Sequence, residues 1–267
     1  MKYKLFGLTM LALIACQPTP QTDNSSNAVS KPVVQTPNKV QIAKLGEGVW
    51  VHTTLYDIPG TGIVPSNGMA VADGEGLILV DTAWGEVATQ AMILQLEADA
   101  KLPVKQVIIT NFKHDRLAGV DWLEAKGVKA FTHPDTPQLS ARIGTPVPNQ
   151  TVAGLKEPQS RTSLGPIEII YPGDAHTPGN LMVYIKDKDI LFGGCMVRNA
   201  KTETMGDISN ANLSNWGPSL NWVKQTYPNT KIVIPCRGQV GTAALLDHTL
   251  AVLAKTVNAK NESESEP

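Results

Sequence analysis

Four strand-like apolar runs in this chain each end in a cluster of polar side chains. The clusters are NFKHDR (111–116), GDAHTPGN (173–180), GGCMVR (193–198) and PCRGQVG (235–241). The run before the first of them, VKQVIIT, has the composition of a buried strand. Such strands alternate with helical segments along the chain. This pattern predicts a layered α/β fold in which loops at strand ends form the functional site.

Periodicity and turn residues predict the individual elements. Strands are expected at 48–56, 66–72, 76–81, 104–110, 167–171, 181–185, 189–194 and 231–235. Helices are expected after Asp81, at 117–126, near 218–226 and at 241–256. The first of these helices is predicted from residues that recur at helical spacing, namely Val87, Ala91, Leu94 and Ala98.

The N-terminus has the features of an export signal. Residues 1–15 combine two lysines with a short apolar run, too short to span a bilayer. The sequence LIAC at 13–16 resembles a bacterial lipobox, which predicts that Cys16 is lipidated; the alternative is plain signal cleavage beside a coincidental cysteine. Because Gln17 is not an aspartate, the resemblance implies anchoring to the outer membrane, facing the periplasm.

The remaining organisation is simple. Residues 16–40 are rich in Pro, Thr, Gln, Ser and Asn and are expected to form a flexible tether. One domain is expected over 41–258, followed by a disordered tail at 259–267. The net charge of -1 and the absence of a basic run argue against nucleic-acid binding. We expect a monomer that meets the membrane only through its lipid anchor.

Together with SNGMAVADGEGLILVDTAW (66–84), the four clusters resemble the metallo-β-lactamase family, in particular its cysteine-ligand, B1-like branch. The resemblance spans about residues 45–258 in the same order. It implies a four-layer αβ/βα sandwich and hydrolysis of β-lactam amides by a zinc-activated water. The segment TLYDIPGTGIVP (54–65) is similar to the mobile hairpin that covers the site in this family, with Gly60 and Gly62 at its tip.

The resemblance also implies where metal ligands should stand. The family has two histidines and an aspartate in the first cluster, then a histidine, a cysteine and a histidine. The corresponding residues here are Asn111, Lys113, Asp115, His176, Cys195 and Arg237. Lysine binds a metal only when deprotonated, and arginine essentially never deprotonates. The resemblance therefore implies at most one zinc, held by Asp115, Cys195 and His176. Asp115 or His176 would then position the attacking water.

Three alternatives remain open at this point. In a zinc-free pseudoenzyme or binding protein, Lys113 and Arg237 would balance the charges of Asp115 and a Cys195 thiolate. Cys236 could instead complete a zinc site with the three retained ligands, or form a disulfide with Cys195 in an oxidising periplasm. The third alternative is another hydrolase of the same fold, such as a thioesterase. The cysteine position and the segment from VPSNG to VDTAW favour the lactamase branch.

Further residues are assigned by the same resemblance. Arg198 corresponds to a cation that binds the substrate carboxylate, and Asp207 lies near the position of an asparagine beside the lactam carbonyl. Trp84 is a candidate substrate contact, although a core role is more common for tryptophan. Asp81 resembles a buried brace of the site, or it caps the following helix.

Arg116 is expected to support the site from behind, whereas His114 should point away from it. Three histidines outside the clusters are expected at the surface or in loops: His52, His133 and His248.

Overall fold

Alternate residues of the central strands face two different hydrophobic cores. In the computed structural model, which describes residues 40–265, Met69 and Val71 of strand β3 (Gly62–Asp73) lie in one core cluster. Ala70, between them, lies in a second cluster. Because side chains of a strand alternate between its two faces, this sheet must be covered on both sides. The neighbouring strand β4 (Gly76–Val80) has the same alternation.

The strands form two mixed sheets. The first has the order β1 (Val40–Gly46), β2 (Val49–Ile58), β3, β4, β5 (Val104–Ile109), β6 (Lys129–Thr132), β7 (Gln150–Thr151). It is antiparallel from β1 to β4 and parallel from β4 to β7. The second has the order β12 (Ile232–Pro235), β11 (Ile190–Gly194), β10 (Met182–Ile185), β9 (Ile167–Tyr171), β8 (Ser160–Leu164). Only its β11–β12 pair is parallel.

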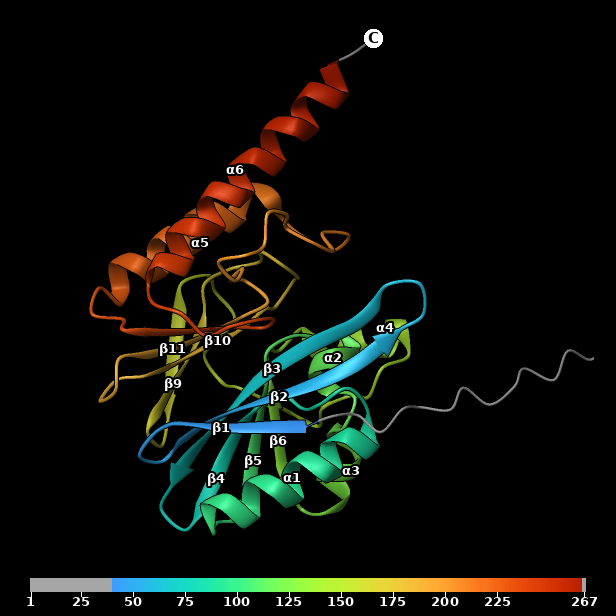
Figure 1. Ribbon diagram of the computed structural model, residues 1–267, viewed down its shortest axis with the longest axis vertical. Helices are drawn as coiled ribbons and strands as arrows, with labels where there is room; N and C mark the ends of the chain where they lie inside the picture. The colour runs from blue at the N-terminus through green and yellow to red at the C-terminus, as the bar shows by residue number, and fades with distance from the viewer. Residues whose placement is uncertain (1–39, 266–267) are drawn as a thin grey trace, which may run out of the picture. The chain divides into compact units, whose positions relative to one another are not determined.

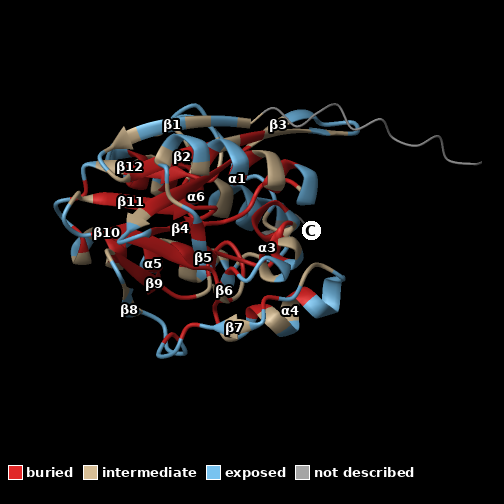
Figure 2. Cartoon of the chain, turned by 90° about the horizontal axis from the view of Figure 1, so that it is seen from below, coloured by how far each residue is buried: buried red, intermediate tan, exposed pale blue. Residues whose placement is uncertain are grey.

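Helices cover the outer face of each sheet, so that the order of layers is α/β/β/α. Helices α1 (Glu86–Ala100) and α3 (Val120–Ala125) share a core cluster with the first sheet. Helices α5 (Leu213–Thr226) and α6 (Ala244–Ser265) share another with the second sheet. A third cluster fills the space between the sheets. Figure 1 shows the two helix pairs on opposite sides, and Figure 2 shows the buried residues concentrated on the strands. The four-layer sandwich predicted from the sequence is confirmed.

Two short helices complete the described part of the chain. They are α2 (His114–Leu117), directly after β5, and α4 (Thr136–Ile143), between β6 and β7. The helix predicted at 117–126 is thus divided, and the break lies at Gly119, which passes too close to Thr89 for any side chain. Segments that the sequence analysis did not predict are β1, β6, β7, β8 and α4.

The helix predicted after Asp81 is confirmed as α1, but the apolar residues whose spacing predicted it do not form its buried face. Val87 and Leu94 are exposed, whereas the buried residues are Ala88, Thr89, Met92, Ile93 and Leu96. Apolar residues occur on both sides of this helix, so spacing alone could not identify the side that meets the sheet. Packing against β1, β2 and the strands beyond decides the face.

Of the two ends of the chain, only the C-terminal one can be compared with its prediction. The tail predicted to be disordered from residue 259 is helical as far as Ser265, because α6 continues without a break. The signal segment 1–15, Cys16 and the tether up to residue 39 lie outside the described residues. Within residues 40–265, none of the helices combines the length and the apolarity that a membrane span requires.

Candidate active site

The end of β5 is held in place by Asp81, the residue that follows β4. Its carboxylate accepts hydrogen bonds from the Thr110 backbone N–H at 2.8 Å and from Thr110 Oγ1 at 2.7 Å. Thr110 in turn accepts a bond from the Leu181 N–H at 2.7 Å, which brings the 111–116 cluster beside the 173–180 cluster. The N-cap of α1 is Gly85, so Asp81 serves as a brace and not as a helix cap.

Arg116 is completely buried and joins three segments of the chain. Its guanidinium donates to the Asn67 carbonyl at 2.7 Å and to the Ser66 hydroxyl, both on β3. It also forms ion pairs with Asp115 Oδ2 at 2.7 Å and Asp81 Oδ2 at 3.2 Å. Burying a guanidinium requires such partners. Burial raises the pKa of Asp81 to about 7, against the opposing charge of Arg116.

The two cysteines meet because β11 and β12 are parallel neighbours. Gly194 pairs with Pro235, and the Cys236 N–H donates to the Gly194 carbonyl at 2.9 Å. Cys195 and Cys236 are therefore side by side, and both are buried free thiols and do not form a disulfide. The Cys236 thiol donates to the Cys195 sulfur; this bond lowers the pKa of Cys195 and raises the pKa of Cys236. Arg116 and His176 further lower the pKa of Cys195.

Arg237 is bound directly to Asp115. Its Nη2 lies 2.9 Å from Asp115 Oδ2, the oxygen that Arg116 also contacts. Its Nη1 donates to the Pro65 carbonyl at 2.8 Å, and its Cζ lies 5.3 Å from the centre of the Trp84 ring. Burial alone would raise the pKa of Asp115, but the charges of Arg116 and then Arg237 lower it to about 2. The pairing predicted for Arg237 is present in the structure.

Lys113 does not take part in this pairing, although the zinc-free alternative assigned it the same role as Arg237. Its ammonium lies 3.0 Å from Asp207 Oδ2 and is hydrogen-bonded to Asn210 Oδ1. Both partners lie in the loop between β11 and α5. The lysine side chain is long enough to reach this loop, and the water-accessible bridge there avoids the desolvation that a second buried cation would require. Lys113 thus connects the start of α2 to the loop that carries Asp207.

The remaining candidate ligands have their own contacts. Asn111 is buried, and its Oδ1 accepts a hydrogen bond from the Lys113 N–H at 2.9 Å. His176 is buried against the edge of Trp216, with ring centres 5.6 Å apart, and hydrogen-bonds Cys195. His176 Nδ1 has no hydrogen-bond partner. A buried ring nitrogen of this kind could accept a proton or bind a ligand.

The side chains do not fit a metal ion in this arrangement. Among residues 40–265, no group of three or more His, Cys, Asp or Glu side chains could hold one. One oxygen of Asp115 is already bound by two guanidinium groups, and the Asn111 oxygen accepts a backbone N–H. Zinc in proteins usually takes three or four protein ligands of these types. We therefore assign no chemical step to a metal in this chain.

A long hairpin of β2 and β3 lies over this region, as predicted for 54–65. The strands stay in register from Val49↔Val71 to Ile58↔Gly62, and the hairpin projects from its sheet (Figure 1). Tyr56, on β2, stacks on Trp84 with ring centres 5.1 Å apart. Trp84 is almost fully buried between Tyr56 and Arg237, so it contributes only a small surface to any bound molecule.

Asn67 is a site residue that sequence reasoning missed. Its backbone N–H donates to the Cys236 carbonyl at 2.8 Å, and its side-chain amide donates to Pro235 and Gly238 carbonyls at 2.9 and 2.8 Å. It thereby fixes the base of the hairpin to the loop that carries Arg237. The position of an asparagine immediately before Gly68 was the only signal available, and its partners are more than 160 residues away.

The other predicted residues lie around this centre. Arg198 lies so close to Gly206 that a Cβ there would be 2.7 Å from Arg198 Nη2. Asp207 follows directly, and hydrogen bonds from Ser209, followed by Lys113, lower its pKa. His114 is exposed, and its ring centre lies 6.5 Å from that of Trp84.

The assignment of His52 to the surface or a loop is wrong, because it lies on β2 and is buried against Gly68. His133 lies in the loop after β6, as the prediction allowed, but it is buried there against Tyr171. His248 is partly buried on α6, with Nε2 2.8 Å from the Thr202 carbonyl.

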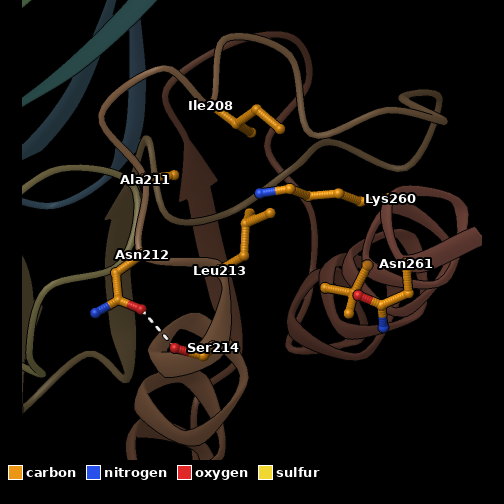
Figure 3. A pocket seen from close by; sticks show the side chains of 8 residues that line it. Ile208, Ala211, Asn212, Leu213, Ser214, Lys260 and Asn261 are labelled. Atoms are coloured by element: carbon orange, nitrogen blue, oxygen red, sulfur yellow. Dashed lines mark hydrogen bonds between the residues drawn. The ribbon is translucent and has the colours of Figure 1, made fainter. Parts of the chain in front are cut away.

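A hollow of about 780 Å³ lies between the β11–α5 loop and α6. Figure 3 shows its lining, which includes Ile208, Leu213, Asn212 and Lys260. It has neither a cysteine, a histidine nor a carboxylate among its lining residues. We therefore locate the chemistry at the Asp115 centre and not in this hollow.

Comparisons with known proteins agree with this architecture. Residues 61–237 match the model of the metallo-β-lactamase superfamily. The chain is 36% identical over 217 residues to the type 2 metallo-β-lactamase of Bacillus cereus, covering 80% of this chain and 82% of that protein. A metallo-β-lactamase structure from Hirschia baltica superposes with a TM-score of 0.77 at 31% identity, covering 80% of this chain and 97% of that one.

A further similar structure is of FIM-1 from Pseudomonas aeruginosa in its mono-zinc form. Its TM-score is 0.77 at 28% identity, and the match covers 81% of this chain and 96% of that chain.

Proposed function

The chain belongs to the metallo-β-lactamase superfamily and is a hydrolase of that type, and from this premise we propose that its substrates are β-lactams. Its named relatives are β-lactamases, and they match it over most of both lengths. The family is zinc-dependent, and one of its similar structures is a mono-zinc form. For this chain we propose slow or narrow turnover and at most one zinc.

The observation that carries the proposed substrate class is a set of three cations, one bound to Asp115 and two beside the loop at 206–207. Arg237 lies on Asp115, while Lys113 and Arg198 flank the loop at 206–207. A cation in a partly buried position binds a carboxylate with a charge-assisted hydrogen bond. β-Lactams that carry a ring carboxylate have an anion of this kind, and we propose that Arg198 binds it. Lys113 is already neutralised by Asp207, so it contributes less.

We assign the handling of the attacking water to Asp115 and His176. Both are buried at the centre, and His176 has a free ring nitrogen. Zinc accepts ligands of the types present at Asp115, Cys195, His176 and Cys236, but in their present contacts these side chains do not form a metal site. However, a pKa of about 2 makes Asp115 a weak base at neutral pH, because a base works best with a pKa near the working pH. This supports slow hydrolysis.

A second candidate function is β-lactam binding without turnover. The Arg116–Asp115–Arg237 contacts favour it, since they engage the one carboxylate that the family's hydrolytic centre would need. Such a protein would sequester a β-lactam without opening the ring. We regard a thioesterase as less well supported, because the relatives that match this chain over most of its length are named as β-lactamases.

Both functions can be tested on the purified full chain with its thiols kept reduced. Binding of a penicillin and a cephalosporin is measured by calorimetry, and ring opening by absorbance, with added zinc and with a chelator. Ring opening above the protein-free rate supports hydrolysis, and binding without it supports the second function. Arg198→Gln should weaken binding about tenfold, the loss of one charge-assisted bond. If neither compound is bound and neither ring is opened, the proposed substrate class is refuted.

We also propose that the protein is an outer-membrane lipoprotein of the periplasm, anchored through Cys16. This proposal rests on the LIAC sequence, on Gln17 and on the tether composition.

A further inference from the structure

We infer that the guanidinium of Arg237 takes the place of a bound cation beside Asp115, so that the folded protein keeps this centre free of metal and balanced in charge. The inference concerns only the metal content and charge of the site. It does not depend on which substrate is bound, so its test and that of the proposed function can fail separately.

The first observation is the continuity of the ion pairs. Arg237 Nη2 lies 2.9 Å from Asp115 Oδ2, Arg116 Nη2 lies 2.7 Å from the same oxygen, and Arg116 Nη1 lies 3.2 Å from Asp81 Oδ2. The buried carboxylate of Asp115 thus has two cationic partners already. A divalent ion at the same oxygen would meet two positive charges at close range, which is strongly unfavourable in a poorly hydrated site.

The second observation is that Arg237 is held in this position from three directions. Besides Asp115, it binds the Pro65 carbonyl at 2.8 Å and lies over the face of Trp84 at 5.3 Å. About two thirds of its side chain is buried, since its relative exposure is 32%. Stacking on an aromatic ring and planar hydrogen bonding are properties of arginine that lysine lacks. A metal could take the position of this guanidinium only if all three contacts were broken.

The third observation is the behaviour of Lys113, which stands at another altered position. Its ammonium binds Asp207 and Asn210 and does not pair with Asp115. Only one of the two substituted cations therefore replaces a metal charge. In the sequence-based hypothesis, both Lys113 and Arg237 replaced the charge of the metal. The structure assigns that role to Arg237 alone, so a single substitution can test it.

The principal test measures zinc by elemental analysis and calorimetric titration on the reduced full chain. Wild type and the charge-retaining Arg237→Lys should both contain much less than one zinc per chain. Arg237→His removes the cation and supplies a ligand, so it should bind zinc at least about tenfold more tightly, the lower limit of what supporting residues contribute to metal sites. Stoichiometric zinc in the wild type would overturn the inference, as would unchanged affinity in Arg237→His.

A second measurement applies if Arg237→His does not fold. Melting temperatures of the metal-free protein are compared for wild type, Arg237→Gln, Asp115→Asn and the double variant. If Arg237 balances the Asp115 charge, the double variant should melt higher than the sum of the two single losses predicts. Additive losses would show that the two side chains are energetically independent and would overturn the inference.

Discussion

At the scale of single residues, the centre depends on one buried arginine. Arg116 is fully buried and connects Asp81, Asp115 and β3 through four contacts. Removing one partner of a buried ion pair leaves the other charge buried and unpaired. The resulting loss of stability is larger than the net stabilisation that the intact pair provides. Arg116 should thus influence the stability of the whole domain and not only of the site.

We expect Arg116→Gln to lower the free energy of unfolding by about 3–5 kcal/mol, because it leaves Asp81 and Asp115 buried with fewer cationic partners. Denaturant unfolding of the purified protein measures this. The control is Arg142→Gln, which changes an exposed arginine on α4 and should shift stability by less than about 0.5 kcal/mol. Equal effects of the two substitutions would contradict the role assigned to Arg116.

The pKa of Asp115 predicts a loss of stability in acid. Its folded pKa is lowered from 3.8 to about 2, so the stabilisation is fully present above 3.8 and is lost as the pH falls toward 2. The size is about 2 kcal/mol for a shift of this order. The raised pKa of Asp81 acts in a separate window and in the opposite sense, lowering stability as the pH rises from 3.8 toward 7.

Asp115→Asn should therefore show a shallower fall in unfolding free energy between pH 4 and about pH 2 than the wild type does. The measurement is denaturant unfolding at several pH values in this range. Parallel curves for the two proteins would mean that Asp115 is not the titrating group.

At the scale of elements, the loop between β11 and α5 is held by one bridge to the start of α2. Lys113 supplies that bridge through Asp207 and Asn210. The side chain of Asp207 is 60% exposed, so the bridge contributes little to global stability. Its effect should instead be local: the bridge should lower the frequency with which the β11–α5 loop opens.

We expect Lys113→Ala to change the free energy of unfolding by less than about 1 kcal/mol while raising the mobility of residues 203–211. Hydrogen exchange followed by mass spectrometry measures that mobility. Lys156→Ala, at an exposed lysine elsewhere, serves as the matched control and should leave exchange in this loop unchanged. Unaltered exchange in Lys113→Ala would show that the bridge does not hold the loop.

At the scale of the whole molecule, two features concern the ends of the chain: the length of helix α6 in the outer layer, and the export signal that we propose for the N-terminal sequence. Helix α6 continues to Ser265, seven residues beyond the boundary predicted at 258. The N-terminal sequence lies outside the described residues. It predicts that the domain is exported and is anchored to the membrane by a lipid. Some 24 tether residues would let it move roughly 25–30 Å from the membrane surface on average.

Cys16→Ser should release the protein from the membrane fraction, because only a lipid attached to Cys16 is expected to anchor it. Cell fractionation and immunoblotting test this. Gln17→Asp, which leaves Cys16 in place, should keep the protein membrane-bound and move it toward the inner membrane. Unchanged fractionation of Cys16→Ser would remove the basis of the lipoprotein proposal.

Much of the architecture was predictable from the sequence alone. Apolar runs such as VKQVIIT and IEIIY have the composition of buried strands, and their alternation with helical segments predicted a layered α/β fold. The four-layer sandwich itself was implied by the family resemblance. The resemblance to the metallo-β-lactamase family, carried by the polar clusters, implied that Asp115, His176 and Cys195 belong to one site. The family follows from the same clusters and their order.

Only the tertiary structure decided which partner each charged side chain takes. Lys113 and Arg237 have similar charge and reach, yet one binds Asp207 and the other Asp115. The buried face of α1 and the burial of His52 were decided in the same way, by neighbours from distant parts of the chain. Sequence patterns report burial and local backbone preference. Pairing of long polar side chains depends on desolvation and on distances that exist only once the sheets have assembled.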